Sequence, residues 1–312
     1  MGDDCFAGFS SGDFPPGVSL RTGKVRDLVD LGDELLITVT DRISAFDRVL
    51  ALIPSKGEIL SRVSLWWFDA TKDVCPNHTA AILSARTTVV RKAKIIPIEV
   101  VVRGYLAGSA WRDYSAGRAV SGLRLAPGMR QNQILGTPLI TPCTKEASGH
   151  DEPISEADIV GRGIASADLW GQVREKALAL FRRGTQVAAS RGLILVDTKY
   201  EFGLLPGGGL VLADELHTPD SSRYWYSAGY EESFRAGLQP RQLDKEHFRG
   251  WLIDRGFMGD GQPPPIPDSL RQEVSLRYIE AYKAIIGKNF TKKALPFEAE
   301  RKIVQRYIYR NK

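Results

Sequence analysis

The sequence predicts a mixed α+β protein, and three observations point to this class. A chain of 312 residues favours two domains or one large domain, at about 150 residues per domain. Short runs in which apolar and polar residues alternate gather in the first hundred positions, as in a mainly β lobe. Further along, longer segments with apolar residues at helical spacing surround a second predicted hairpin. The remainder of the chain is therefore expected to mix helices and strands and to end in helices.

Composition excludes several classes of protein. Charged residues make up 25% and hydrophobic residues 43% of the chain, which is typical of a folded globular protein and excludes a disordered chain, a collagen-like fibre and a membrane bundle. The longest apolar run, residues 95–102, is interrupted by Pro97 and Glu99 and falls short of the ~20 residues of a spanning helix. Residues 1–20 lack the basic start and apolar block of a signal peptide. A cytoplasmic location without membrane contact is expected.

Charge and cysteine content add two weaker expectations. The net charge of +5 would suit a polyanionic partner, such as a nucleotide or nucleic acid. The densest basic stretch, residues 288–312, carries apolar residues at helical spacing and is better explained by a solvated helix face. Three widely spaced cysteines without a C-x-x-C pair predict free thiols; they are Cys5, Cys75 and Cys143.

The individual elements follow from periodicity and from turn residues. In chain order, the sequence predicts a hairpin over 24–40 turning at Gly32 and Asp33, a helix over 59–70, strands over 80–91 and 95–103, a long ordered loop over 126–152, a helix start at Ser155, a helix over 166–190, a strand over 193–197, a second hairpin over 197–216 and a helix over 269–286. Long loops with little periodicity usually carry function.

The second hairpin is the most informative segment. A two-residue turn at Gly207 and Gly208 would place Glu201 opposite Asp214. Two carboxylates about 5 Å apart repel by roughly 3 kcal/mol at an effective dielectric of 20, and a divalent cation would reverse that sign. Mg²⁺ prefers one or two carboxylates together with phosphate oxygens. The alternative is an exposed acidic hairpin that Lys199, on the same face as Asp197 and Glu201, neutralises.

Three further segments carry residues suited to anions. Gly23 beside Lys24, within residues 22–26, resembles a strand turn that covers phosphates, although an edge strand is the alternative and no P-loop pattern occurs. Residues 103–109 combine an arginine with small residues that let a ligand approach, or form a structural loop. Residues 218–223 offer hydroxyls, Asp220 and Arg223, unless Asp220 caps a helix.

The remaining polar residues carry weaker indications of function. Residues 41–47 are explained by a surface turn with an ion pair. His150, beside Asp151 on the long loop, is the one histidine whose neighbours suggest a ligand or proton role. The other three are expected at the surface; they are His78, His217 and His247. No Ser-His-Asp or Cys-His set can be assembled.

Six segments in this order resemble the SAICAR synthetase family. They are GKVRDLVDLG (23–32), TDRISAFD (40–47), IPIEVVVRGYLAGSAW (96–111), HDEPIS (150–155), VDTKYEFG (196–203) and ADELHTPDSSRYW (213–225). The resemblance covers about residues 22–287. It implies a two-lobed enzyme with a kinase-like or ATP-grasp-like cleft that binds Mg-ATP between the lobes. We expect residues 1–98 to cover the ATP phosphates, and residues 99–312 to hold the metal and the nucleotide substrate.

The family's reaction joins L-aspartate to 5-amino-1-(5-phospho-D-ribosyl)imidazole-4-carboxylate (CAIR), giving SAICAR, ADP and phosphate in purine biosynthesis. The resemblance implies four sets of residues. ATP would contact Gly23, Lys24, Val25, Arg26 and the strand around Glu99; Mg²⁺ would bind Glu201 and Asp214; the imidazole nucleotide would meet Arg103, Ser109, Asp197, Lys199, Asp220 and Arg223; and L-aspartate would lie near Ser44, Lys145, His150, Asp151 and Glu152. Lys24, Lys199, Asp197 and Arg223 are the expected catalytic groups.

The chemistry follows from what a carboxylate lacks. It has no leaving group, so ATP would convert the imidazole carboxylate to an acyl phosphate that the aspartate amine then attacks. Another kinase-like phosphotransferase is an alternative, but the chain has no H-R-D or D-F-G string. A basic nucleotide-binding or RNA-binding protein is the alternative outside enzymes. The sequence leaves the oligomeric state open.

Overall fold

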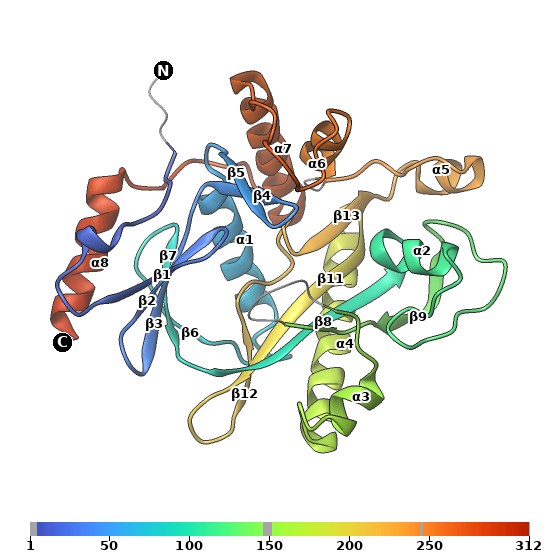
Figure 1. The fold of residues 1–312 in the computed structure, drawn as a ribbon, viewed down its shortest axis with the longest axis horizontal. Helices are drawn as coiled ribbons and strands as arrows, with labels where there is room; N and C mark the ends of the chain where they lie inside the picture. Colours follow the sequence, from blue (N-terminus) through green and yellow to red (C-terminus); the bar gives the residue numbers. More distant parts are fainter. Residues whose placement is uncertain (1–4, 146–151, 244–245, 312) are drawn as a thin grey trace. The chain divides into compact units, whose positions relative to one another are not determined.

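The chain forms two compact units, shown as ribbons in Figure 1. The structure, a computed structural model, describes residues 5–145, 152–243 and 246–311. Unit 1 contains residues 1–66, 78–92 and 244–312, and unit 2 contains residues 67–77 and 93–243. This grouping differs from the expected lobes 1–98 and 99–312, because the C-terminal helices belong with the N-terminal sheet.

Unit 1 is built on an antiparallel five-stranded sheet of order β1-β2-β3-β7-β6. Its strands are β1 (Ser19–Thr22), β2 (Arg26–Asp30), β3 (Glu34–Val39), β6 (Thr79–Ile82) and β7 (Thr87–Arg91). The predicted hairpin over 24–40 is confirmed as β2 and β3. The single strand predicted over 80–91 is wrong, because the N–H groups of Leu83 and Ser84 both donate to the Thr87 carbonyl and turn the chain back.

Both ends of the chain complete the core of unit 1. Phe6, Phe9 and Phe14 pack with Val304 and Ile308 of the last helix against strands of the sheet. Within the basic C-terminal segment, residues 297–310 form a helix with one buried face, as the apolar spacing there predicted. The unit also contains η1 (Ser11–Asp13), β4 (Arg42–Ala45), β5 (Arg48–Leu52), most of α1 (Lys56–Ala70), α6 (Glu246–Ile253), α7 (Asp268–Ile286) and α8 (Phe297–Arg310).

Unit 2 is built on a six-stranded sheet around one long strand, β11 (Leu193–Leu204). This strand pairs with β8, β12 and β13, and β8 pairs in turn with β9 and β10. The predicted strand over 193–197 and the first arm of the second hairpin are therefore one continuous strand. The other strands are β8 (Lys94–Tyr105), β9 (Ile134–Ile140), β10 (Cys143–Thr144), β12 (Leu210–Ala213) and β13 (Ser222–Tyr226).

Two helices of unit 2 begin at serine caps. Ser155 accepts a hydrogen bond from the Asp158 N–H, and Ser166 accepts one from the Leu169 N–H, so both predicted starts are confirmed. The segment 126–152, expected to be a loop throughout, contains β9 and β10. The helices are α2 (Gly108–Ser115), α3 (Glu156–Gly161), α4 (Ala167–Ala189) and α5 (Tyr230–Ala236).

Helix α4 packs against the β8–β11 region of the sheet. A Cβ at Gly104 of β8 would lie 3.2 Å from the Phe181 ring, and a Cβ at Gly184 would lie 2.7 Å from Leu195 of β11. Both glycines therefore permit a close approach of helix and sheet. Among the described residues, no helix is long and apolar enough to cross a membrane.

Candidate active site

The acidic hairpin forms with a register one residue away from the predicted one. Glu201 pairs with Ala213, and Leu204 pairs with Leu210. The turn contains three residues rather than two, because the Gly208 N–H donates to the Leu205 carbonyl while Leu205 donates to Gly209. Gly207, with φ of 97°, occupies the position of a Pro-Gly type II turn that requires positive φ. The predicted direct pairing of Glu201 with Asp214 is therefore wrong.

Asp214 nevertheless acts electrostatically on Glu201. It follows Ala213, the strand partner of Glu201, in a left-handed conformation with φ of 67°. Burial raises the pKa of the Glu201 carboxyl above its ordinary value, and the negative charge of Asp214 raises it further. The neighbouring acids that the sequence predicted are thus present, although the predicted strand register is not.

Two lysines compensate this acidic cluster in unit 2. Lys145 forms an ion pair with Glu201, whose side chain is only 8% exposed. The Nζ of Lys199 lies 2.6 Å from the Glu99 carboxylate on the adjacent strand. Burial disfavours the charged form of Lys199, but Glu99, then Glu201 and Asp214, raise its pKa above the ordinary value. Lys199 is therefore a permanent cation within this cluster.

The carboxylates of Glu201 and Asp214 are suited to a hard divalent cation that is also bound by oxygen atoms of a substrate. Among the described residues, no group of three or more His, Cys, Asp or Glu side chains could hold a metal ion. Two carboxylates, Glu201 and Asp214, raise the cost of each other's charge. Mg²⁺ is bound in many nucleotide enzymes by one or two carboxylates and substrate phosphates, so this pair fits Mg²⁺ better than it fits an all-protein metal cage.

An arginine cluster lies further along the same strand. The Oδ2 atom of Asp197 accepts hydrogen bonds from Arg103 at 3.1 Å and Arg223 at 3.3 Å. Arg103 also donates to Thr141 at 2.8 Å and to Ser109 at 2.9 Å. Burial lowers the pKa of Arg103 from its ordinary value. Asp197 thus orients two guanidinium groups, which are suited to bind a phosphate or carboxylate.

The start of α2 leaves room for one of these guanidiniums. Gly108 has φ of 58°, and a Cβ there would lie 2.8 Å from both terminal nitrogens of Arg223. This explains why a small residue occurs at this position of the segment 103–109, which leads into α2. Ser109 reaches Arg103 from the first turn of that helix.

Asp220 lies in a turn that leads into a strand. The Asp220 N–H donates to the Thr218 hydroxyl at 3.3 Å, and β13 begins at Ser222. The alternative of a helix cap is therefore wrong. Thr218 also donates to Glu215 at 2.5 Å, so hydroxyl groups order the whole turn.

Unit 1 contains the segment expected to cover phosphates. The Gly23 N–H donates to the Arg26 carbonyl at 2.7 Å, which closes a tight loop between β1 and β2. The Nζ of Lys24 lies 2.5 Å from Asp47, and both side chains are 56% exposed. That surface ion pair was expected for residues 41–47. Asp41 and Arg42, in contrast, are buried, because β4 begins there and pairs with β5.

The residues expected near L-aspartate have different outcomes. Ser44 lies on β4 opposite Val49 in unit 1, and Lys145 contacts Glu201 in unit 2. Glu152 donates its N–H to the Thr144 hydroxyl. His150 and Asp151 lie outside the described residues.

Sequence reasoning missed two buried histidines. His217 is fully buried rather than at the surface, and its Nε2 lies 2.7 Å from the Tyr200 hydroxyl. His78 is also buried, with 6% exposure, and the side chain of His247 lies outside the described residues. The one local signal was the apolar neighbour Leu216, which is too weak to overrule the usual surface position of histidine. The three cysteines are free thiols, as predicted.

The fold and the site together define a class of enzyme. A two-lobed α+β protein with arginines oriented by Asp197 and an acidic cluster around Glu201 has groups suited to bind phosphorylated substrates and a nucleotide. These are the requirements of an ATP-dependent ligase that activates a carboxylate.

Comparison with known proteins gives the family. The family model for SAICAR synthetase matches residues 19–264. The chain is 45% identical to phosphoribosylaminoimidazole-succinocarboxamide synthase of Legionella pneumophila (strain Paris), covering 92% of this chain and 94% of that protein. It is 47% identical to the protein of the same name from Bacteroides thetaiotaomicron, covering 92% and 93%. The chain belongs to the SAICAR synthetase family.

Solved structures agree with this assignment. The SAICAR synthase of Saccharomyces cerevisiae complexed with SAICAR has a TM-score of 0.79 and 33% identity over 91% of this chain and 98% of that one. A SAICAR synthetase in complex with ADP has a TM-score of 0.68 and 26% identity, covering 88% of this chain and 100% of that one. The protein is an ATP-dependent carbon–nitrogen ligase that condenses L-aspartate with CAIR through an acyl phosphate, in purine biosynthesis.

Proposed function

We propose that Glu201 and Asp214 bind Mg²⁺ in this ligase. The observation that carries the proposal is that Asp214 directly follows Ala213, the strand partner of the buried Glu201, so that two acids lie close together. Burial and the charge of Asp214 raise the pKa of the Glu201 carboxyl, which agrees with this placement. A bound divalent cation would remove that repulsion and would neutralise part of the negative charge on the phosphates of ATP. Within this proposal Lys199, held by Glu99, supplies a second and permanent positive charge.

We infer ATP-binding residues in each unit. In unit 1, the loop formed by Gly23, Lys24, Val25 and Arg26 covers the phosphates and offers two cationic side chains. In unit 2, the backbone of β8 near Glu99 binds the adenine. The related structure described as a complex with ADP supports nucleotide binding.

The arginine cluster is the proposed site of the imidazole nucleotide. Arg103 and Arg223 are oriented by one carboxylate, Asp197, and Ser109 holds Arg103 from the other side. Planar guanidinium groups with a fixed orientation bind carboxylates and phosphates in a bidentate manner. Asp220, on the ordered turn that precedes Arg223, is proposed to contact the same substrate.

The residues then divide the work of the reaction. Lys24, Arg26 and Lys199 offset the negative charge that shifts as the phosphoryl group moves to the substrate carboxylate. Asp197 or Asp220 accepts the proton of the aspartate amine when the amide bond forms. Ser44, Lys145 and the segment with His150 to Glu152 are proposed on the L-aspartate side. We expect a cytoplasmic enzyme with small-molecule partners.

An ADP-release assay with each substrate omitted in turn tests the assignment of sites. Wild-type protein is expected to release ADP only when ATP, CAIR, L-aspartate and Mg²⁺ are all present. Arg223→Lys, which keeps the charge but loses the bidentate fork, is expected to raise the KM for CAIR more than the KM for ATP. The opposite pattern would place Arg223 outside the CAIR site.

A further inference from the structure

The backbone of the proposed phosphate loop, residues 23–26, is fastened through its carbonyl groups. Arg42 donates from Nη2 to the Gly23 carbonyl at 3.0 Å and from Nε to the Lys24 carbonyl at 3.2 Å. The Val25 carbonyl accepts from both the N–H and the hydroxyl of Thr40, each at 2.9 Å. The Arg26 carbonyl accepts from Gly23. All four carbonyl oxygens, which would repel phosphate oxygens, are therefore engaged by the protein.

The guanidinium group that does this is itself held in place. Arg42 Nη2 lies 2.7 Å from the Asp27 carboxylate, and Nη1 donates to the Ala7 carbonyl at 2.6 Å. The exposure of Arg42 is 8% and that of Asp27 is 1%. A buried charge pair is costly to desolvate unless further hydrogen bonds satisfy it, and here the N-terminal segment supplies them. The Phe9 N–H donates to the other Asp27 oxygen at 2.7 Å.

The segment formed by residues 5–9, here called the N-terminal strap, fits closely against this pair. Gly8 has φ of 115°, and a Cβ there would lie 2.3 Å from Arg42 Nη1 and 2.4 Å from the Asp27 carboxylate. Only glycine fits this position, for reasons of both backbone and space. The strap precedes residue 19, where the family model begins to match.

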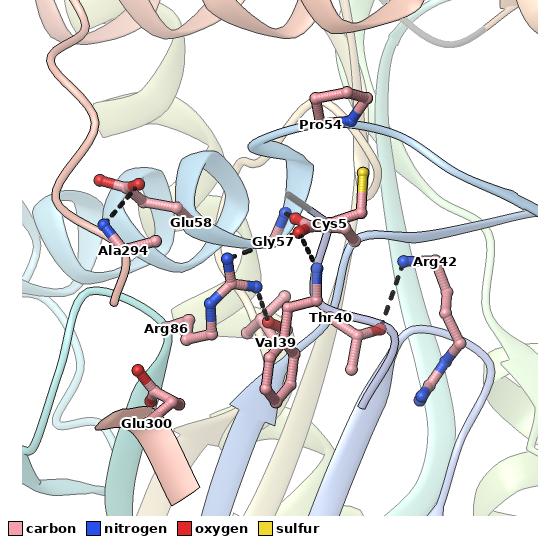
Figure 2. A network of polar contacts seen from close by, with 12 residues as sticks. Cys5, Val39, Thr40, Arg42, Pro54, Gly57, Glu58, Arg86, Ala294 and Glu300 are labelled. Atoms are coloured by element: carbon pink, nitrogen blue, oxygen red, sulfur yellow. Dashed lines mark hydrogen bonds and ion pairs between the residues drawn. The ribbon is translucent and has the colours of Figure 1, made fainter. Parts of the chain in front are cut away.

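The strap is anchored beyond the Arg42 pair. The Phe6 N–H donates to Asp41 at 2.7 Å, and the other Asp41 oxygen accepts from Gly57 at the start of α1, also at 2.7 Å. Figure 2 shows polar contacts in this part of unit 1, among them the hydrogen bond from the Arg42 N–H to the Thr40 hydroxyl and that from Arg86 to the Val39 carbonyl. The rings of Phe6 and Phe9 pack 5.7 Å and 5.9 Å from Phe297 of α8. The strap is thus continuous with the core of unit 1.

We propose that the N-terminal strap sets the shape of the phosphate loop through Asp27 and Arg42, with Arg42 as the positioning residue, and thereby determines the affinity for the nucleotide's phosphates. The proposal rests on the assignment of residues 23–26 to ATP binding. A purely structural strap would stabilise unit 1 without distinguishing a phosphorylated nucleotide from its nucleoside. A positioning strap affects only the phosphate-bearing ligand.

Two variants of the full-length chain test this by isothermal titration calorimetry with ATP and with adenosine. Gly8→Ala displaces the guanidinium without changing any residue of the loop. Arg42→Lys keeps a positive charge beside Asp27 but loses the fork that reaches two carbonyls. Both are expected to weaken ATP binding about tenfold, or about 1.4 kcal/mol, and to leave adenosine binding unchanged. Each is measured well below its own melting temperature.

Gly17→Ala is the matched control for Gly8→Ala. Gly17 also has positive φ, of 83°, but a Cβ there would meet nothing within 4 Å, so its ratio of ATP to adenosine affinity should match that of the wild type. If Gly8→Ala and Arg42→Lys lower the melting temperature while keeping that ratio, the strap is structural only and the inference is wrong. Lys24→Ala tests the assignment of the loop to ATP separately from the role of the strap. An unchanged ratio of ATP to adenosine affinity in that variant would contradict the loop's assignment to ATP.

Discussion

Tyr200 and His217 form a hydrogen bond, 2.7 Å between the phenol oxygen and Nε2, with both side chains fully buried. The Trp67 ring lies 4.6 Å from the imidazole in an edge-on arrangement, and a Cβ at Gly184 would lie 2.4 Å from it. His217 also has φ of 49°, in the left-handed region. Strained residues of this kind persist where their surroundings fix them. Here the groups packed around His217 fix the turn between Asp214 and Asp220.

The burial of His217 predicts a loss of stability in mild acid. Burial lowers the pKa of His217 to about 3, from an ordinary value of 6.5. Below pH 6.5 the unfolded chain gains a proton that the folded chain excludes, so the free energy of unfolding falls as the pH drops, until about pH 3. At pH 5 the loss from this group is about 2 kcal/mol. Urea denaturation at pH 7.5 and pH 5.0 measures it.

Two variants assign this pH dependence. His217→Asn, with a side chain that tolerates left-handed backbone, should be less stable at pH 7.5 but should lose about 2 kcal/mol less between the two pH values. Tyr200→Phe removes the hydrogen bond and keeps the imidazole buried, so its pH dependence should remain like that of the wild type. An equal loss in His217→Asn and wild type would mean that other groups are responsible.

Glu201→Gln and Asp214→Asn should remove activity without unfolding the protein. Each variant deletes one of two acids that oppose each other's charge in the metal-free protein, so the melting temperature should fall little or even rise. Turnover, measured as ADP release, should decrease at least about a hundredfold, because charge stabilisation by the metal is lost. Near-normal rates in either variant would contradict the metal assignment.

Lys145→Met should strengthen metal binding in the absence of nucleotide. Lys145 neutralises Glu201 in the metal-free protein, and an incoming cation must replace that ion pair. Because the Lys145 side chain is 41% exposed, the pair contributes about 1 kcal/mol or less, and the affinity for Mn²⁺ should rise about two- to fivefold by electron paramagnetic resonance. Lys145→Arg, which retains the charge, should bind Mn²⁺ like the wild type. Weaker binding by Lys145→Met would make Lys145 an aid to the metal rather than its competitor.

Gly108→Ala should selectively impair the proposed CAIR site. The added methyl group would collide with the Arg223 guanidinium and turn it away from Asp197. We expect the KM for CAIR to rise about tenfold, the value of one charged hydrogen bond, while the KM for ATP changes little. Gly117→Ala, at the other end of α2, has similar positive φ of 73° but open space around it, and should behave like the wild type.

The hairpin shows how far local sequence rules reach. Alternation along 197–204 correctly placed Asp197, Lys199 and Glu201 on one strand, and both glycines predicted for the turn lie in it, together with Pro206. The register was wrong by one residue, because a run of three glycines, 207–209, allows either a two-residue or a three-residue turn. Only the pairing observed in the sheet decides between them.

Contacts between distant segments could not be predicted in the same way. Arg42 looked like a surface residue because its partners, Ala7, Gly23 and Asp27, lie up to 35 positions away. His217 is buried by α4 and by α1, and nothing in its own neighbourhood of the sequence indicates either helix. The six ordered motifs were sufficient for the family, whereas the burial of these two residues depends on tertiary packing.

Strand β11 fixes the distance between two carboxylates of unit 2, those of Asp197 and Glu201. Since a strand advances about 3.3 Å per residue, Asp197 and Glu201 are anchored roughly 13 Å apart along a backbone that is paired on both sides. Side-chain motion can adjust that separation only slightly. Inserting or deleting a single residue between them would send one of the two carboxylates through to the opposite surface of the sheet, so evolution can vary these side chains far more easily than their spacing.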